Sequence, residues 1–302
     1  MTAVADFEGI YVAMYSAYDD AGEVDRERVK KLARYYAGKG IKGLYVGGSS
    51  GEGILQSAEE RKHTLEAVME EVKGELTVIV HVGANSTRES VELSKHAERW
   101  GANAISAVPA IYYRLPEAAV EHHWQQMIDS TELPFIIYNI PQTTGFHLSA
   151  SLCRKLAKQD KVIGVKMSGE STFELQQFKE AGGEDFLVFN GPDEQFLAGR
   201  IMGADGGIGG TYGVMPELFC ALNELYEKEK LVEAQLLQVT INGFIKRLLG
   251  YPSLYGACKF ILSLRGIETG KPRLPLLPVR PEHRESLAAL NAEIEASIAS
   301  CR

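Results

Sequence analysis

One structural unit recurs along about the first 225 residues of this 302-residue chain, and it constrains the fold more than any single motif. Each unit consists of an apolar run of strand type, a polar turn, an amphipathic helical pattern and a glycine near the helix end. The apolar runs are 8–14, 42–47, 77–82, 103–108, 134–138, 162–166, 186–190 and 205–209. Strands that alternate with helices predict a parallel sheet with helical crossovers.

Helix-start and helix-end signals lie between these runs. Three Ser-x-x-Glu patterns fit the capping box at a helix N-terminus, at Ser57–Glu60, Ser86–Glu89 and Ser171–Glu174. After the first pattern, apolar residues recur at helical spacing, at Leu65, Val68, Met69 and Val72. Glycines that suit a left-handed cap stand before the next strands, at Gly40, Gly101 and Gly203.

Eight such units predict an α/β fold, a closed (β/α)8 TIM barrel. A doubly wound open sheet is the alternative. After Pro216, which suits the first turn of a helix, only helical patterns follow, near 230–248, 253–265 and 282–299. We therefore expect a catalytic barrel domain over residues 1–225 and a C-terminal helical region over 226–302, packed on the barrel.

Charge and cysteine content exclude several classes of protein. The chain has 40 acidic and 32 Lys or Arg residues, which argues against a nucleic-acid-binding surface. The four cysteines, at 153, 220, 258 and 301, form no Cys-x-x-Cys pair, so reduced thiols in the cytoplasm are expected. The sequence shows neither a signal-peptide pattern nor 18 uninterrupted apolar residues. We expect a cytoplasmic protein with no membrane and no nucleic-acid partner.

Polar residues, tyrosines and glycines follow several of the predicted strands. In a (β/α)8 barrel, the carboxyl ends of the strands share one rim, where the chemistry takes place. The residues at these positions are the Gly47–Gly51 loop with Ser49 and Ser50, Tyr112 and Tyr113, Tyr138, Lys166, Asp193 and Glu194, and the glycines at 206, 207, 209 and 210. The sequence therefore predicts one rim with a lysine, hydroxyls, carboxylates and bare backbone.

Lys166 has an ordinary interpretation and a chemical one. A lysine after a strand is commonly a solvated loop residue. A lysine amine that loses solvation at the end of an apolar strand can instead attack a carbonyl carbon. Tyr138, taken alone, is typical of a core aromatic residue. Beside a Schiff base, its phenol can transfer a proton.

The other rim residues also allow two interpretations. The Gly47–Gly51 loop is either a flexible turn or a nest of backbone N–H groups and hydroxyls for a carboxylate. Asp193 and Glu194 either cap the next helix or accept hydrogen bonds from a polyol. The seven histidines lack a His-Glu-x-x-His spacing, and no dinucleotide fingerprint occurs in a suitable context. We therefore expect no metal and no organic cofactor.

Five motifs occur together in one order along the chain: GLYVGGSSGE, YNIP, GVKMSG, NGPDE and GADGGIGGTY. This ordered set resembles the N-acetylneuraminate lyase and dihydrodipicolinate synthase superfamily of pyruvate-dependent class I aldolases. The resemblance covers residues 7 to 225, and the helical tail is similar in kind. It implies a (β/α)8 barrel with a C-terminal helical region and a homotetramer built as a dimer of dimers.

The resemblance also implies roles for individual residues. Lys166 falls on the family's Schiff-base lysine, and Tyr138 falls on its proton-transferring tyrosine. Ser49 and Ser50 fall on the hydroxyl residues that hold the carboxylate of pyruvate. Tyr112 is similar to a tyrosine that reaches across a subunit interface in the family.

Several positions bear on the branch within the superfamily. Dihydrodipicolinate synthases have an arginine for a substrate carboxylate where this chain has Thr143. The sialic acid lyases bind a polyhydroxy tail at positions that correspond to Ser168, Gly191, Asp193, Glu194 and Gly210. Gly210 departs from the serine that is usual there. Ser16-Ala17-Tyr18 and Pro109-Ala110-Ile111 replace the usual Thr-Pro-Phe.

The resemblance is closest to N-acetylneuraminate lyase, so we expect a class I lyase that cleaves a 2-keto sugar acid. N-acetylneuraminate is the preferred substrate, and pyruvate and N-acetylmannosamine are the products. One alternative is another pyruvate-dependent aldolase or synthase of the superfamily. A second alternative, of a different class, is a keto-acid-binding protein without catalytic turnover.

Overall fold

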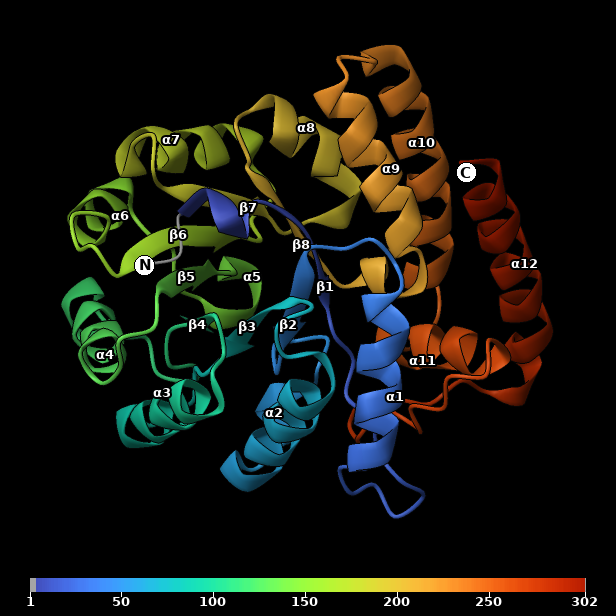
Figure 1. Ribbon diagram of the computed structural model, residues 1–302, viewed down its shortest axis with the longest axis horizontal. Coiled ribbons are helices and arrows are strands. Elements are labelled where there is room, and N and C mark those ends of the chain that lie inside the picture. Colours follow the sequence, from blue (N-terminus) through green and yellow to red (C-terminus); the bar gives the residue numbers. More distant parts are fainter. Residues whose placement is uncertain (1–3, 302) are drawn as a thin grey trace.

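The sheet closes on itself, which confirms the predicted (β/α)8 barrel and excludes the doubly wound alternative. The computed structural model describes residues 4–301. The first three residues of the predicted barrel domain and the last residue of the predicted helical region lie outside this range. The strands are parallel and pair in chain order, and β1 pairs with both β2 and β8. Figure 1 shows the strands as a ring surrounded by helices.

Each strand coincides with one of the eight predicted runs to within one residue at either end. The strands are β1 (Gly9–Ala13), β2 (Gly43–Val46), β3 (Thr77–His81), β4 (Ala104–Ala107), β5 (Phe135–Asn139), β6 (Val162–Met167), β7 (Leu187–Asn190) and β8 (Gly206–Gly209).

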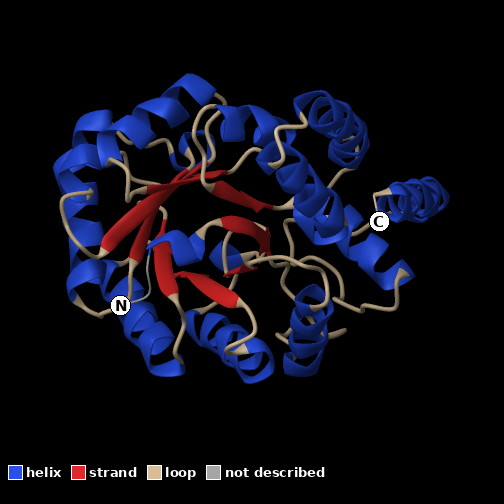
Figure 2. Cartoon of the chain, turned by 45° about the horizontal axis from the view of Figure 1, so that its top comes forward, coloured by secondary structure: helices blue, strands red, loops and turns tan. Residues whose placement is uncertain are grey.

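The helices form the outer layer of the barrel and the C-terminal region (Figure 2). The α-helices are α1 (Arg26–Ala37), α2 (Ala58–Val72), α3 (Thr87–Trp100), α4 (Glu117–Asp129), α5 (Pro141–Thr144), α6 (Ala150–Leu156), α7 (Thr172–Gly182), α8 (Phe196–Ile201), α9 (Pro216–Glu227), α10 (Leu231–Leu249), α11 (Leu254–Leu264) and α12 (Arg284–Ser300). Short 3-10 helices lie at η1 (Val4–Phe7), η2 (Gly53–Leu55), η3 (Asp193–Gln195), η4 (Thr211–Val214) and η5 (Pro281–His283).

The predicted helix caps are present, although the three capping boxes are formed to different degrees. Ser57 and Glu60 make the reciprocal capping box at α2, whose stripe of Leu65, Val68, Met69 and Val72 is buried. At Ser86 and Ser171 the side chain accepts the backbone N–H three residues on, which is half of the box. The three predicted cap glycines have positive φ angles: Gly40 at +73°, Gly101 at +80° and Gly203 at +99°.

Two apolar layers hold the barrel together. Inward-pointing side chains from successive strands fill the interior, among them Tyr11, Tyr45, Ile136 and Phe189. Side chains on the opposite faces of the strands pack against the helices. Phe7 of η1 joins the interior layer, and its carbonyl accepts a hydrogen bond from the Tyr11 hydroxyl at 2.8 Å. The barrel is therefore a packed core, and the chemistry is confined to its rim.

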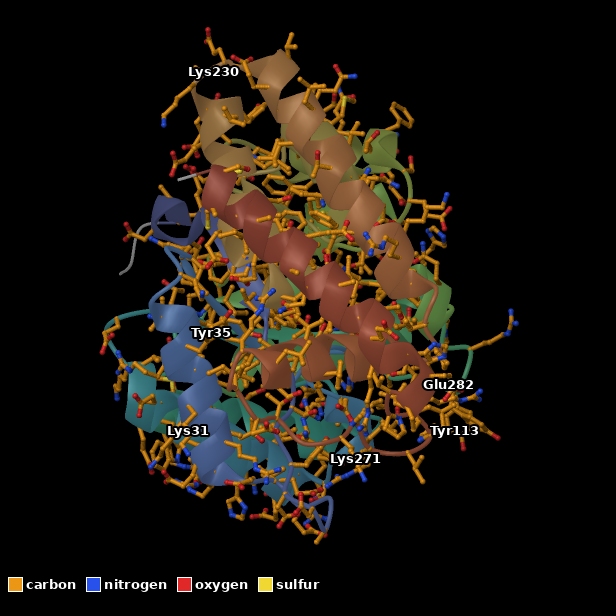
Figure 3. All side chains as sticks on the ribbon, turned by 90° about the vertical axis from the view of Figure 1, so that its right-hand side faces the viewer. Lys31, Tyr35, Tyr113, Lys230, Lys271 and Glu282 are labelled. Atoms are coloured by element: carbon orange, nitrogen blue, oxygen red, sulfur yellow. The ribbon has the colours of Figure 1, made fainter. Side chains whose placement is uncertain are left out.

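The C-terminal helices follow the predicted segments and cover one side of the barrel. Pro216 begins α9, as predicted. The outermost helix, α12, begins near Glu282 on the side where Tyr113 lies and runs toward the end of the molecule where Lys230 lies (Figure 3). The division at residue 225 stays a prediction, since α11 also contacts the barrel rim, as described below.

Among residues 4–301, we find no helix that combines the length and the apolar character needed to cross a membrane. All four cysteines are free thiols, with Cys153 and Cys258 buried and Cys301 exposed.

Candidate active site

Lys166 and Tyr138 are direct partners across the β5–β6 pair. The register places Tyr138 opposite Lys166. The Lys166 amine lies 4.0 Å from the centre of the Tyr138 ring and 4.6 Å from that of Tyr45. Only 5% of the Lys166 surface is exposed, so this lysine is not a solvated loop residue. The structure thus contradicts the ordinary interpretation of Lys166 and places its amine inside the barrel rim.

A local irregularity in β6 aims this lysine inward. Strand side chains alternate between the two faces of a sheet. Ile163 belongs to the barrel interior, whereas Val165 and Met167 pack toward the helices. Strict alternation would therefore turn Lys166 outward. The β5–β6 register shifts next to Phe135, so that Val162 and then Gly164 are the partners of consecutive residues of β5. This bulge changes the alternation and returns Lys166 to the interior.

The Tyr138 hydroxyl has an electrostatic environment suited to proton transfer. Burial raises the pKa of Tyr138. The positive charge of Lys166 lowers it, as do hydrogen bonds with Ser49, Lys166 and Ser168. The lowering effects are larger together, so the pKa of Tyr138 lies below its ordinary value. Ser49 of the motif GLYVGGSSGE and Lys166 and Ser168 of the motif GVKMSG therefore meet at the phenol of Tyr138.

His81 at the end of β3 was not singled out in the sequence, and it organises the neighbouring backbone. Burial, with a contribution from Arg61, lowers the pKa of His81 well below its ordinary value, so the ring is neutral. Its Nε2 accepts the Val108 N–H at 3.3 Å. The other nitrogen, Nδ1, therefore carries the proton and donates to the Gly47 carbonyl at 3.1 Å. His81 thus links Gly47, at the start of the Gly47–Gly51 loop (the glycine–serine loop below), to the end of β4.

The glycine–serine loop is compact rather than flexible. A Cβ atom on Gly48 would lie 2.6 Å from the Tyr45 ring, and one on Gly53 would lie 2.0 Å from the Gly47 carbonyl oxygen. The two serines that were predicted to hold a carboxylate differ in solvent exposure. Ser49 is exposed, whereas Ser50 is buried. Tyr255 of α11 hydrogen-bonds to Ser50 through its side chain. Glycine is needed here for close backbone packing.

A cavity of about 370 Å³ opens beside this loop. Its walls are largely apolar, and its lining includes Ser49, His81, Tyr138, Thr143 and Tyr255. A cavity of this size with a few convergent polar groups is typical of a small-molecule site. Thr143 lines the cavity at the position where an arginine would supply a carboxylate partner. Lys166 does not line the cavity, but its amine lies against the ring of Tyr138, which does.

None of the five predicted tail-binding positions lines this cavity. A Cβ atom on Gly191 would lie 2.1 Å from the Ser168 hydroxyl, so these two positions touch. A Cβ atom on Gly210 would lie 2.9 Å from the Ser50 hydroxyl. A serine at position 210 would therefore crowd Ser50, which explains why glycine suits this chain.

Asp193 and Glu194 differ sharply in environment. The Asp193 side chain is buried, and its Oδ2 accepts the Thr211 N–H at 2.6 Å and the Thr211 hydroxyl at 2.5 Å. Burial raises the pKa of Asp193 to about 6, and the hydrogen bonds with Thr211 oppose the rise. Glu194 is exposed, and its carbonyl accepts a hydrogen bond from Asn242 at 3.0 Å. Glu194 therefore has the freer carboxylate.

Tyr112 lies apart from the other predicted residues. It is 90% exposed, has a φ angle of +83° and packs edge-to-face on Tyr113 at 5.2 Å. A positive φ is uncommon for a residue with a side chain. Among residues 4–301, the aromatic partner of Tyr112 is Tyr113, and the predicted reach of Tyr112 across a subunit interface stays a prediction.

Among residues 4–301, no group of His, Cys, Asp and Glu side chains is arranged to hold a metal ion. The charged and hydroxyl groups gathered at the rim are instead a lysine amine, a phenol and two serines, which suit a carbonyl compound that carries a carboxylate. Fold and site together define a (β/α)8-barrel protein whose reactive groups stand at the carboxyl ends of the strands.

The comparison with known proteins narrows this class to one family. Residues 6–294 match the model of the dihydrodipicolinate synthetase family, and the chain belongs to this family. The chain is 43% identical over 288 residues to an N-acetylneuraminate lyase of Mediterraneibacter gnavus. The match covers 94% of this chain and 91% of the relative. The chain is 38% identical to an N-acetylneuraminate lyase of Rhizobium meliloti, covering 95% and 94%.

Solved structures agree with this assignment. A catalytic lysine mutant of the Ruminococcus gnavus sialic acid aldolase superimposes with a TM-score of 0.98 at 41% identity, covering 100% of both chains. The CdNal protein of Clostridium difficile, in complex with mannosamine, superimposes with a TM-score of 0.92 at 32% identity, covering 95% of this chain and 99% of that one.

Proposed function

We propose that this protein is a class I carbon–carbon lyase that cleaves N-acetylneuraminate to pyruvate and N-acetylmannosamine through a Schiff base on Lys166. The observation that carries the proposal is the buried pair of the Lys166 amine and the Tyr138 ring, 4.0 Å apart, beside a loop with two hydroxyls. The relatives named N-acetylneuraminate lyase, at 35–43% identity, support the same activity.

The residues have the following roles in the proposed reaction. The Lys166 amine attacks the C2 ketone of the open-chain substrate, and loss of water forms a protonated imine. Tyr138 accepts the proton of the C4 hydroxyl while the C3–C4 bond breaks. The electron pair of that bond moves toward the imine, which leaves an enamine and releases the aldehyde. Protonation at C3 and hydrolysis of the imine then free pyruvate and the lysine.

The other predicted residues hold the substrate. Ser49 and Ser50 bind the carboxylate, which orients C2 toward the Lys166 amine. Ser168, Gly191, Asp193, Glu194 and Gly210 surround the polyhydroxy tail. Because Thr211 occupies one oxygen of Asp193, Glu194 offers the better acceptor for tail hydroxyls. Thr143 in place of an arginine disfavours dihydrodipicolinate synthesis, since no bidentate partner for a second carboxylate is present there.

We further infer that the enzyme works in the cytoplasm as a homotetramer, a dimer of dimers. Four free thiols suit a reducing compartment. The exposed Tyr112 and Tyr113, which lie 5.2 Å apart, are an aromatic pair of the kind that is enriched in protein interfaces. Tyr112 of one protomer would then complete the site of its neighbour.

Reduction with borohydride in the presence of pyruvate tests the mechanism. We expect a covalent adduct that peptide mass mapping places on Lys166, and its loss in Lys166→Met. Release of pyruvate from N-acetylneuraminate tests the substrate. An adduct without cleavage of the sugar acid would favour another aldolase of the family. The absence of any adduct on the folded protein would overturn the Schiff-base mechanism.

A further inference from the structure

Glu52 is a fully buried carboxylate directly after the turn that carries Ser49 and Ser50. Its backbone has a φ angle of +55°, in the left-handed region that residues with side chains rarely adopt. None of its side-chain surface is exposed. A buried carboxylate is costly unless its oxygens accept hydrogen bonds, so the partners of Glu52 explain why it is tolerated.

Three segments that are distant in sequence donate to this carboxylate. Its Oε1 lies 2.6 Å from the Lys259 amine of α11 and 2.5 Å from the Ser16 hydroxyl after β1. Its Oε2 accepts the backbone N–H of Arg273 at 2.7 Å, from the segment between α11 and α12. Glu52 therefore joins the first strand, the serine turn and the C-terminal helical region at one point.

Lys259, like Glu52, is buried and has a partner for each of its polar atoms. Only 1% of its side-chain surface is exposed. Its amine also donates to the Ser16 hydroxyl at 2.7 Å and to the Lys271 carbonyl at 3.4 Å. The amine lies 4.6 Å from the centre of the Tyr18 ring. The three N–H groups of the ammonium thus have three acceptors, which is what a buried cation requires.

Glu52 also takes part in the backbone hydrogen bonds of the serine turn, which is the turn that carries Ser49 and Ser50. The Glu52 N–H donates to the Ser49 carbonyl at 3.1 Å, and the Gly53 N–H donates to the Gly48 carbonyl at 3.1 Å. Glu52 also borders the 370 Å³ cavity, and Lys259 and Arg273 line a second cavity of about 1080 Å³. The ion pair therefore links a residue that borders the candidate site to a C-terminal helix.

A buried ion pair adds little net stability compared with apolar side chains of the same volume. Its value lies in the position that it imposes, because few arrangements satisfy both charges. We propose that Glu52 and Lys259 are positioning residues that hold the Ser49 and Ser50 hydroxyls where they bind the carboxylate of the 2-keto acid. This inference rests on the proposed function, and it adds that the C-terminal helical region takes part in substrate binding.

The test is borohydride trapping at a series of pyruvate concentrations, with adduct formation measured by intact mass. For Glu52→Gln and Lys259→Met we expect the half-saturating pyruvate concentration to rise at least about tenfold, the equivalent of about 1.4 kcal/mol. The adduct yield at saturation should stay near that of the unchanged protein, because Lys166 is untouched. Lys259→Arg keeps the charge and should recover most of the affinity.

Glu217→Gln is the matched control. Glu217 pairs with Lys39 at 2.7 Å, and this ion pair is also largely shielded, with side chains 15% and 19% exposed. It lies near the start of β2 and of α9, away from the serine turn. Its loss should leave the half-saturating concentration unchanged. If the half-saturating pyruvate concentration rose equally in this control, the effect at Glu52 would be explained by general destabilisation. That result would overturn the proposal.

The other outcomes separate the inference from the proposed function. If the unchanged protein forms no adduct, the proposed function fails. If it forms one and Glu52→Gln saturates at the same pyruvate concentration, the positioning role fails and the function stands. Should Glu52→Gln not fold, Ser16→Ala removes one hydrogen bond to each partner without changing charge. We expect about a fivefold rise in that variant, and no rise would overturn the proposal.

Discussion

Tyr138 is the residue whose hydroxyl, rather than its ring, matters for the proposed reaction. In Tyr138→Phe, the ring still fills the barrel interior, while the group that accepts the C4 proton is lost. We expect turnover of N-acetylneuraminate to fall about 100-fold or more, as for the loss of a general base. Steady-state release of pyruvate measures this. Tyr226→Phe removes a hydroxyl that donates to the Arg200 carbonyl and should leave turnover unchanged. Equal losses in both variants would refute the role of Tyr138.

Asp193 should make stability depend on pH in a direction unusual for a carboxylate. Its pKa is raised from 3.8 to about 6 in the folded protein, mainly by burial. Between these values the folded state binds more protons than the unfolded state, so the contribution of Asp193 to the free energy of unfolding falls as pH rises. Asp193→Asn does not titrate. Its stability relative to the unchanged protein should therefore increase from pH 4 to about pH 6 and then level off. Urea unfolding at several pH values measures this, and a difference that is flat or falls with pH would contradict it.

Site residues that belong to ordered motifs could be predicted from the sequence. Residues whose importance comes only from their neighbours in the folded structure could not. Lys166, Ser49 and Ser168 lie around the Tyr138 hydroxyl. The first two were selected as rim residues, whereas Ser168 was selected through the resemblance. His81 and Tyr255 were missed because a single histidine or tyrosine has no pattern around it. The position of His81 at the end of an apolar run was the one available signal. The pairing of Glu52 with Lys259 joins positions 207 residues apart, which no local pattern can reveal.

At the scale of the element, the close approach of β6 to β7 next to the bulge depends on Gly164. A Cβ atom there would lie 2.5 Å from the Leu187 carbonyl oxygen, a backbone atom that cannot move away cheaply. We expect Gly164→Ala to distort the β6–β7 pair and to lower the yield of the pyruvate adduct on Lys166, with a loss of about 1–3 kcal/mol in the free energy of unfolding. Urea unfolding and borohydride trapping measure the two effects.

Gly243→Ala is the control for this change, because nothing lies within 4 Å of a Cβ atom added there. Helix propensity favours alanine at that position of α10, so its stability should be equal or higher. Unchanged adduct yield in Gly164→Ala would show that the orientation of Lys166 does not depend on this glycine.

The eight strands could be predicted because each is an apolar run bounded by turn residues. The direction of the Lys166 side chain could not be predicted in the same way. Alternation along β6 depends on the bulge next to Phe135, and a bulge is defined by the pairing with β5 rather than by the residues of β6. The prediction of a chemical role for Lys166 therefore rested on the end of the strand and on the resemblance.

For the whole molecule, the C-terminal helices contribute to stability as well as to the site. The buried face of α12 consists of Leu287, Leu290, Ile294 and Ile298. We expect Leu290→Ala to lower the free energy of unfolding by about 2–5 kcal/mol, as for other buried leucines. Leu264→Ala, at a position that is 44% exposed, should cost much less. Urea unfolding compares the two, and equal losses would show that α12 is not packed as described.

The C-terminal end of the chain has a practical consequence. Helix α12 begins on the side of the molecule where Tyr113 lies and runs away from it, so Cys301 follows its far end (Figure 3). Cys301 is the exposed thiol among four cysteines, of which Cys153 and Cys258 are buried and Cys220 is half-buried. A thiol-reactive linker should therefore attach the enzyme to a solid support chiefly at this end. The side of the molecule where Tyr113 lies would then face the surrounding solution, and the immobilised catalyst would need no engineered handle (Figure 3).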